Sequence, residues 1–322
     1  MKTSFTIGLD LGGTKLAAAL LDQHGQIIDF QKVPVELRRE SSVAQTQRRI
    51  IGLMGDLTCD FKKRFPKEVS SKYFKGIGLA SAGPLNVERG ELIFPANFPG
   101  WKKVPLVSLL EDEIRKRGFS KRIHFQHDAT AAALAEGWIG AAQKMNTFAV
   151  VTIGTGIGTG IVFNGLPAQS RGMGSEYGHT IVDFSQIQQS PKEIKYGTVE
   201  GIASGLSLLR RARQRGFHGV SVEELVADKN PKYQSLYKDM ALALGCLCHN
   251  LSIGYNLEKI FLSGGLIKIR NLYLDDLKAH YKDMIRQTNP AFECKIEIAK
   301  TKNKAGVIGA GYLPYLYSKR SR

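Results

Sequence analysis

Two glycine-rich stretches, each lying between apolar segments, contain the residue types that bind phosphate. In the first, IGLDLGGTK, Asp10 ends an apolar run and Gly12, Gly13, Thr14 and Lys15 follow it. Glycines at a strand-to-strand turn permit positive φ and let backbone N–H groups approach a ligand. Successive N–H groups in such a turn form a concave anion site. Thr14 adds a hydroxyl donor, Lys15 adds a cation, and the Asp10 carboxylate can hold hydrated Mg²⁺.

The second stretch, VVTIGTGIGTGIVFNG, repeats this plan about one domain later with Gly154, Thr155, Gly156 and Gly158. A single turn of this kind can also be a tight hairpin that binds nothing, because short motifs are weak evidence. Two hairpins of the same design suggest two related lobes. Together they predict a clamp for the phosphates of a nucleoside triphosphate.

The elements that position these turns follow from the apolar runs. Strands are expected at 5–11, 15–22, 26–33, 74–82, 121–126, on both sides of the turn in 148–165, at 259–263 and at 294–299. Helices are expected at 42–65, 105–117, 128–142, 198–213, 234–255, 273–286 and 305–318. Strands mixed with helices of roughly ten or more residues indicate an α/β fold. The length of 322 residues favours two domains.

The composition is that of a globular protein with an unusual charge. The chain has 45 lysines and arginines against 29 acidic residues, a net charge of +16. Such an excess favours anionic partners, but the basic residues are dispersed, so solvated helix faces explain it better than a nucleic-acid site. The uncharged segment 145–170 is broken by glycines and threonines, which excludes a membrane span. Four irregularly spaced cysteines favour a reducing cytoplasm.

Further blocks accompany the two hairpins along nearly the whole chain, from residue 7 to about 313. They are GIGLASAGPLN (76–86), PANFPGWKKVPL (95–106), HDATAAALAE (127–136), GSEYGH (174–179), GTVEGIASG (197–205) and LSGGL (262–266). In this order the blocks resemble those of the ROK family, which comprises sugar kinases and sugar-responsive repressors within the actin-like ATPase superfamily. As a set, they are highly specific.

The resemblance implies a two-lobed actin-like ATPase fold, of the ribonuclease H-like type, with a central cleft. Residues 1–126 would form the N-terminal lobe, with the first hairpin and part of the sugar site, and the C-terminal helix 305–322 would pack back on it. Residues 127–304 would form the C-terminal lobe, with the catalytic aspartate, the second hairpin and the adenosine site. In the family, glycines such as Gly264 and Gly265 let adenosine lie flat against the backbone.

Asp128 begins the alanine-rich segment DATAAALAEGWIGAA. In ROK kinases the aspartate of this block is the catalytic base, which accepts the proton of the sugar hydroxyl. At the first turn of a helix the dipole favours an ionised carboxylate. The alternative, on local grounds, is an N-cap aspartate that serves only the helix.

Sugar hydroxyls need hydrogen-bond donors and acceptors, so a sugar site should contain carboxylates and amides. By resemblance, the substrate-binding residues are Gly83, Asn97, His127, Glu176, His179 and Glu200. His127 departs from the asparagine that is common in the family. Because imidazole differs in reach and can become charged, the preference between sugar epimers stays open.

Many ROK proteins also bind a structural zinc ion through the histidine that corresponds to His179 and through three cysteines. The matching positions are Pro191, Glu193 and Thr198. None of these is a thiolate, so a sulfur-rich tetrahedral site cannot form. We therefore expect no zinc.

The expected activity is ATP- and Mg²⁺-dependent phosphorylation of a hexose at its 6-hydroxyl, as in a glucokinase or hexokinase. N-acetylhexosamine kinase and fructokinase activities stay open, and so does polyphosphate as the donor. A different class is a non-catalytic sugar-sensing regulator, but family repressors carry an additional N-terminal DNA-binding domain, whereas this chain begins at the first hairpin. We expect a cytoplasmic homodimer that binds a hexose and a nucleotide, and neither a membrane nor nucleic acid.

Overall fold

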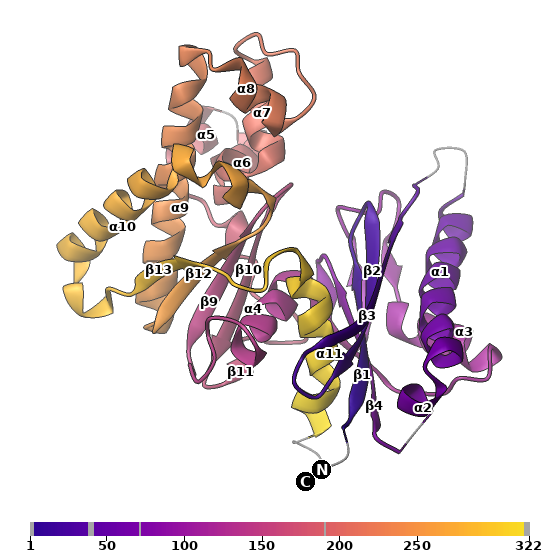
Figure 1. Ribbon diagram of the computed structural model, residues 1–322. Helices are drawn as coiled ribbons and strands as arrows, with labels where there is room; N and C mark the ends of the chain where they lie inside the picture. Colours follow the sequence, from indigo (N-terminus) through magenta and orange to yellow (C-terminus); the bar gives the residue numbers. More distant parts are fainter. Residues whose placement is uncertain (1–2, 38–41, 71, 190, 319–322) are drawn as a thin grey trace. The chain divides into compact units, whose positions relative to one another are not determined.

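The computed structural model describes residues 3–37, 42–70, 72–189 and 191–318, and Figure 1 labels its elements. Contacts divide the chain into two compact units. The first unit comprises Met1–Lys144, Pro167–Gly174 and Lys304–Arg322, and the second comprises Met145–Leu166 and Ser175–Asn303. The expected division into residues 1–126 with 305–322 and residues 127–304 stays a prediction about which parts act as lobes.

The first unit is built on a five-stranded sheet in the order β3-β2-β1-β4-β8. Its strands are β1 (Phe5–Leu11), β2 (Lys15–Asp22), β3 (Ile27–Pro34), β4 (Phe74–Ser81) and β8 (Ile123–His127). A small sheet contains β5 (Leu85–Asn86), β6 (Glu91–Ile93) and β7 (Lys103–Val104). The helices are α1 (Val43–Arg64), α2 (Pro66–Val69), α3 (Leu106–Lys116), α4 (Asp128–Trp138) and α11 (Ala305–Ser318). β1 pairs antiparallel with β2 and parallel with β4.

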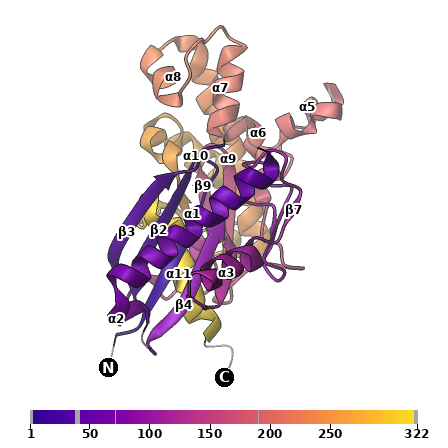
Figure 2. The same cartoon turned by 90° about the vertical axis from the view of Figure 1, so that its right-hand side faces the viewer.

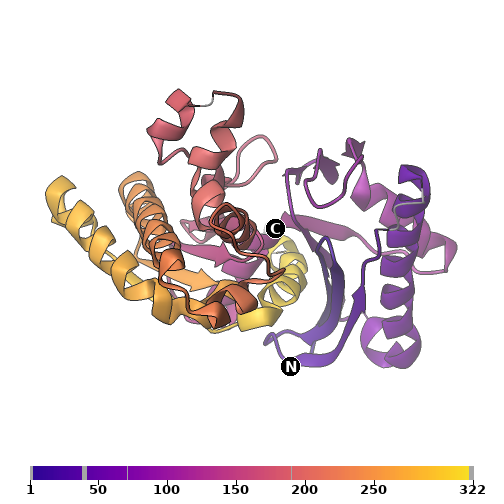
Figure 3. The ribbon, with the colours of Figure 1, turned by 90° about the horizontal axis from the view of Figure 1, so that it is seen from above.

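The alternation of side chains along β1 determines which helix covers which face of this sheet. Ile7, Leu9 and Leu11 belong to a buried cluster that includes apolar residues of α1. Gly8 and Asp10 point to the other face, because successive side chains of a strand alternate, and this face is covered by α11. Figure 2 shows α1 and α3 in front of the sheet, and Figure 3 shows α1 and α11 on opposite sides of it. Asp10 therefore lies on the α11 face.

Small residues allow α11 to pack against both the sheet and α4. A Cβ atom at Gly8 or Gly78 would overlap backbone carbonyl oxygens of α11, and one at Gly309 would overlap the carbonyl oxygen of Ala131 in α4. Ala80, Ala131 and Ala310 form a buried cluster between these elements. The alanine and glycine content of α4 and α11 is thus a requirement of close backbone packing.

The second unit repeats the arrangement with a five-stranded sheet in the order β11-β10-β9-β12-β13. Its strands are β9 (Phe148–Ile153), β10 (Ile157–Phe163), β11 (Leu166–Pro167), β12 (Lys259–Ser263) and β13 (Lys295–Ile298). The helices are α5 (Phe184–Gln189), α6 (Val199–Ala203), α7 (Gly205–Arg213), α8 (Val222–Asp228), α9 (Gln234–Tyr255) and α10 (Leu274–Thr288). As in the first unit, an antiparallel hairpin (β9–β10) is followed by parallel pairing with the next strands. The predicted repetition of design is therefore present in the two sheets.

Short 3-10 helices connect these elements. They are η1 (Tyr177–His179), η2 (Pro191–Gly197), η3 (Pro231–Tyr233), η4 (Gly265–Leu272), η5 (Pro290–Phe292) and η6 (Lys302–Lys304). Among the described residues, no helix is both long enough and apolar enough to cross a bilayer.

Two predicted helices differ from the structure. The helix expected over 198–213 is divided at Ser204, whose backbone is extended and whose hydroxyl accepts a hydrogen bond from Ser207 N–H at the start of α7. The helix expected over 128–142 ends at Trp138, and the carboxylate of Glu136 then accepts a hydrogen bond from Ala141 N–H at 2.7 Å. In both places a side chain satisfies backbone N–H groups that a continuous helix would have paired.

Candidate active site

The first hairpin is a short turn between β1 and β2. Gly12 N–H donates to the carbonyl oxygen of Lys15 at 2.9 Å, and Val35 N–H donates to that of Thr14 at 2.9 Å. Thr14 and Lys15 are exposed at the turn, as a phosphate-binding role requires.

The expected reason for the hairpin glycines was partly wrong. None of Gly12, Gly13, Gly154 and Gly156, all within the described residues, has a positive φ. Gly13 is explained instead by close approach, because a Cβ atom there would lie 2.9 Å from Cβ of Asn97. The absence of a side chain matters at this position, and the backbone conformation does not require glycine.

Asp10 lies at the end of β1, on the face covered by α11. Its carboxylate occupies the space where a Cβ atom of Gly306, in the first turn of α11, would lie. Burial, and next the Coulombic repulsion of Asp128, raise the pKa of Asp10 to about 7, whereas Lys32 lowers it. A buried carboxylate beside a second one has the chemistry of a cation ligand, because a cation offsets both the burial and the repulsion.

Asp128 is the first residue of α4, directly after β8. The N-cap is His127, whose side chain makes no capping hydrogen bond, so Asp128 is not the N-cap residue, and its role as the base stays a prediction. One Asp128 oxygen accepts a hydrogen bond from Ala129 N–H at 2.6 Å and lies 3.4 Å from Nε2 of the buried His127. With 42% of its side chain exposed, Asp128 can accept a proton from a bound hydroxyl.

Asn97 lies in the turn between β6 and β7, and its side chain is exposed. The turn is held by the stacked rings of Phe98 and Trp101, whose centroids are 4.7 Å apart, and by Phe98 N–H donating to Pro95 O at 3.0 Å. Gly83 lies in the loop between β4 and β5. The first unit thus brings Gly13 next to Asn97, and it brings Asp10 close enough to Asp128 for electrostatic repulsion.

The second hairpin joins β9 to β10 and is held by residues of α6 and α7. Gly154 N–H donates to Gly156 O at 2.9 Å, and Gly205 N–H donates to Gly154 O at 2.8 Å. Oε2 of Glu200 accepts a hydrogen bond from Ile157 N–H at 2.8 Å. A predicted sugar-binding carboxylate is therefore bonded to the backbone of a predicted phosphate hairpin.

Glu176 and His179 are exposed in the loop that ends in η1. The buried hydroxyl of Thr159, on β10, donates to Ser175 O at 2.7 Å and accepts from Tyr177 N–H at 3.2 Å. These two bonds attach the loop to β10 and so determine where Glu176 lies.

Gly264 ends β12 with φ of 98°, and a Cβ atom there would overlap the backbone of Ile153 at the end of β9. Gly265 begins η4 with open space at its Cβ position. Together with Thr155 and Gly158 of the hairpin, these residues lie at the ends of adjacent strands, β9, β10 and β12. The expectation that both hairpins hold one nucleotide stays a prediction.

The positions that match zinc-binding cysteines have other roles here. Thr198 caps α6, because its hydroxyl accepts a hydrogen bond from Gly201 N–H at 3.0 Å and donates to Lys195 O at 2.7 Å. Glu193 lies within η2, and Pro191 begins it. No three His, Cys, Asp or Glu side chains of the described residues are grouped to hold a metal ion. The expectation of no zinc stays a prediction.

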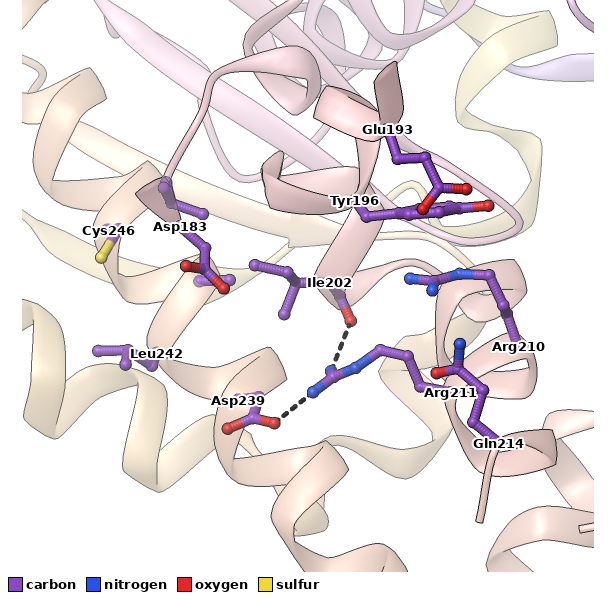
Figure 4. Close-up of a pocket in the computed structure, with 12 residues that line it drawn as sticks. Asp183, Glu193, Tyr196, Ile202, Arg210, Arg211, Gln214, Asp239, Leu242 and Cys246 are labelled. Atoms are coloured by element: carbon purple, nitrogen blue, oxygen red, sulfur yellow. Dashed lines mark hydrogen bonds and ion pairs between the residues drawn. The ribbon is translucent and has the colours of Figure 1, made fainter. Parts of the chain in front are cut away.

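A cavity of about 640 Å³ lies in the second unit behind α6 (Figure 4). Ile202 and Ala243 line it, the guanidinium of Arg210 lies 3.9 Å from the ring centroid of Tyr196, and Arg211 pairs with Asp239. The lining residues include none of the predicted site residues. The cavity shares α6 with Glu200, but it is separate from the hairpin.

Three residues that were not predicted from the sequence affect the position or the charge of predicted site residues. Gly306 makes room for the carboxylate of Asp10, Thr159 anchors the loop of Glu176, and Lys32 lowers the pKa of Asp10. Lys32 had a detectable signal, because it lies within the strand β3, which pairs with β2 of the first hairpin and places Lys32 opposite Ala17. Gly306 had none, since its role depends on α11 packing against β1.

The comparisons with known proteins agree with this geometry. The chain is 29% identical to a glucokinase of Halalkalibacterium halodurans over 97% of this chain and 96% of that protein. It is 28% identical to an N-acetylmannosamine kinase of Haemophilus influenzae, with coverage of 95% and 94%. The crystal structure of a ROK hexokinase from Thermus thermophilus, 27% identical, matches with a TM-score of 0.78 over 99% of this chain and all of that chain.

The predicted fold class, an α/β fold of the actin-like ATPase type, is confirmed by the similarity to the Thermus hexokinase. The profile of the ROK family matches residues 6–315. Its hairpins, its Asp128 block and its sheets extend over the same range. The chain therefore belongs to the ROK family.

Proposed function

We propose that this protein transfers the γ-phosphoryl group of ATP to the 6-hydroxyl of a hexose. The names of its relatives, glucokinase, hexokinase and N-acetylmannosamine kinase, support sugar phosphorylation. The observation that carries the proposal is the placement of Asp128, a partly exposed carboxylate at the start of α4 that interacts electrostatically with Asp10 of the first hairpin.

Asp128 acts as the general base. Its free oxygen accepts the proton of the 6-hydroxyl as the oxygen of that hydroxyl attacks the γ-phosphorus, and the bond between the γ-phosphorus and the bridging oxygen of ADP breaks. The hydrogen bond from Ala129 N–H holds one carboxylate oxygen, which leaves the other for the sugar. Asp128 thereby orients the hydroxyl as well as deprotonating it.

The sugar hydroxyls are bound by Gly83, Asn97, His127, Glu176, His179 and Glu200. The phosphates of ATP are bound by Asp10, Gly12, Gly13, Thr14, Lys15, Gly154, Thr155, Gly156 and Gly158, and the adenosine lies against Gly264 and Gly265. Asp10 would hold Mg²⁺, which would supply charge neutralisation for the phosphates. The burial of the Asp10 carboxylate next to Asp128 fits this role.

The test is an ADP-release assay of the purified chain with ATP and Mg²⁺ against glucose, mannose, fructose and the N-acetylhexosamines, followed by phosphorus NMR of the product. We expect sugar-dependent ADP release and phosphate on the 6-oxygen. Absence of sugar-dependent ADP release with every hexose, while the protein still binds one of them, would establish a binding-only regulator. The similarity to an N-acetylmannosamine kinase supports that substrate as the second candidate.

The proposal also covers the phosphate donor, the cellular location and the oligomeric state. The donor is ATP, and polyphosphate supplied in its place in the same assay tests the alternative. A cytoplasmic location is proposed because ATP is available there and because the four cysteines are free thiols. A homodimer is proposed from the family resemblance, and sedimentation velocity tests it.

A further inference from the structure

We propose that Gly13 and Gly156, one glycine in each phosphate hairpin, are positioning residues for the sugar. Because each glycine has no side chain, a sugar-binding residue of the same unit can occupy the space beside it. Each hairpin thereby sets the position of one sugar-binding residue. This inference rests on the proposed function, because it takes Asn97 and Glu200 to bind the sugar.

In the second unit the contact joins Gly156 to Glu200. A Cβ atom on Gly156 would lie 2.5 Å from Oε2 of Glu200, which is too close for two unbonded atoms. The same Oε2 accepts the hydrogen bond from Ile157 N–H at 2.8 Å. The hairpin therefore fixes one oxygen of the carboxylate, and the other oxygen stays available for a sugar hydroxyl.

In the first unit the contact joins Gly13 to Asn97. A Cβ atom on Gly13 would lie 2.9 Å from Cβ, 3.2 Å from Cγ and 3.3 Å from the carbonyl oxygen of Asn97. These atoms lie close to the Asn97 backbone, in a turn held by the stacked rings of Phe98 and Trp101. Asn97 can yield only if the turn moves, whereas Glu200 can yield by turning its side chain.

The conformation of the hairpins does not require these two glycines. Neither has a positive φ, so an alanine would be unstrained in its backbone. The neighbouring glycines differ in what surrounds them: a Cβ atom on Gly154 meets nothing within 4 Å, and one on Gly12 would lie 3.3 Å from the carbonyl oxygen of Lys15, a tight contact within the hairpin itself. Of these four glycines, only Gly13 and Gly156 have a proposed sugar-binding residue in the way.

The two pairs of neighbours supply matched variants. Gly156→Ala displaces the Glu200 carboxylate and breaks a charge-assisted hydrogen bond, so we expect binding of glucose to weaken about tenfold. Gly13→Ala shifts the Asn97 turn, and we expect a similar or larger loss. Gly154→Ala, whose Cβ atom meets nothing, should leave the dissociation constant for glucose, measured without nucleotide, within about twofold of wild type, and Gly12→Ala should weaken glucose binding less than Gly13→Ala does.

The measurement is isothermal titration calorimetry with D-glucose, and in parallel N-acetyl-D-mannosamine, in the absence of nucleotide. Leaving the nucleotide out separates the inference from a general effect on the hairpins. If the hairpins served phosphate alone, all four variants would bind the sugar as wild type does and would differ only with an ATP analogue. That result would overturn the inference.

A double-mutant cycle identifies the contact. Glu200→Asp shortens the side chain and withdraws it from residue 156. If Gly156 acts through Glu200, the loss of sugar affinity in Gly156→Ala/Glu200→Asp is smaller than the product of the two single losses. Independent, multiplicative losses would contradict the inference. Circular dichroism confirms folding, and the Gly13 and Gly12 pair decides the question if Gly156→Ala does not fold.

The outcomes separate the inference from the function on which it rests. If wild type phosphorylates a hexose but Gly13→Ala and Gly156→Ala bind it normally, the kinase proposal holds and the inference fails. If wild type neither binds nor phosphorylates any hexose, both fail. Turnover by wild type together with selective loss of sugar binding in these two variants supports both.

Discussion

The two hairpins have the same strand order around them but present different chemistry. In the first, Asp10 lies in register between Ala17 and Ala80, and in the second, Thr152 lies in register between Gly158 and Ser263. The first hairpin therefore carries a half-buried carboxylate where the second carries a neutral hydroxyl. A repeated topology can thus serve two roles: in the proposed function the first hairpin holds the cation beside the base, and the second offers backbone N–H groups to phosphate.

The residues and helices that contact the two hairpins also differ. The first faces Asp128 and the helix α11, which bury its carboxylate. The second is held by α6 and α7, whose Glu200 and Gly205 bond to the turn. Turnover should therefore be more sensitive to the loss of a carboxylate beside the first hairpin than to a change at the corresponding place in the second.

The largest effect is expected from Asp128→Asn. The amide cannot accept the proton of the hydroxyl, so kcat should fall by about 10²- to 10⁴-fold with little change in sugar affinity. Steady-state ADP release and calorimetry measure the two quantities. The control is Asp275→Asn, an exposed aspartate in the first turn of α10, which should keep wild-type turnover. Equal turnover in the two variants would reject Asp128 as the base.

The next prediction concerns the carboxylate that distinguishes the first hairpin. The pKa of Asp10 rises from 3.8 to about 7 in the folded protein. Between these values the native state retains a proton that the unfolded chain releases, so stability falls as pH rises toward 7. The Asp10→Asn variant has no such carboxyl and does not lose stability in this way. The difference between its free energy of unfolding and that of wild type should therefore increase by about 2 kcal/mol from pH 5 to pH 8.

Urea unfolding at the two pH values measures this difference. Thr152→Val, at the corresponding place in the second hairpin, removes no carboxylate, so its stability relative to wild type should not depend on pH. If the difference in free energy of unfolding between Asp10→Asn and wild type is the same at pH 5 and pH 8, the raised pKa of Asp10 is contradicted.

Thr152→Asp gives the second hairpin the charge of the first. A carboxylate beside bound phosphates repels them, so the KM for ATP should rise about fivefold to tenfold. Thr152→Asn has nearly the same shape without the charge and serves as the control. If both variants raise the KM for ATP equally, the effect is due to the shape of the new side chain and not to its charge.

The smallest effect is expected at the support of Glu200. Thr198→Ala removes the cap of α6 and should lower the free energy of unfolding by about 1 kcal/mol. Because α6 carries Glu200, sugar binding should also weaken about twofold to threefold. Ser221 caps α8 in the same unit, and Ser221→Ala should lose similar stability without a change in sugar affinity. Identical sugar affinity in the two variants would show that the cap does not position Glu200.

Much of the fold could be predicted from local pattern. The bounds of β1, β2, α9, β12 and α11 follow from apolar runs bounded by glycines and polar residues, which are signals read from neighbouring residues. The break of a helix at Ser204 was missed, because a capping serine and an interior one look alike in sequence. β5, β6 and β7 were missed because strands of two or three residues have no measurable alternation.

The site was predictable as a set of motifs but not as a set of contacts. The glycine turns and Asp128 could be identified, yet the reason for Gly13 and Gly156 lies in side chains distant along the chain. Gly306 beside Asp10 and Glu200 beside Ile157 depend on packing that sequence spacing does not encode. The role of each glycine was therefore visible only when its missing Cβ atom was compared with its neighbours in space.

The packing of α11 has a consequence for biosynthesis. Asp10 precedes the second unit in the chain, but the helix that packs against it is made of residues 305–318 and is translated after that entire unit. Until then, the exposed small-residue face of β1, β4 and α4 is available to chaperones and to wrong partners. The Asp10 face of the first sheet is therefore completed only after the second unit has been translated.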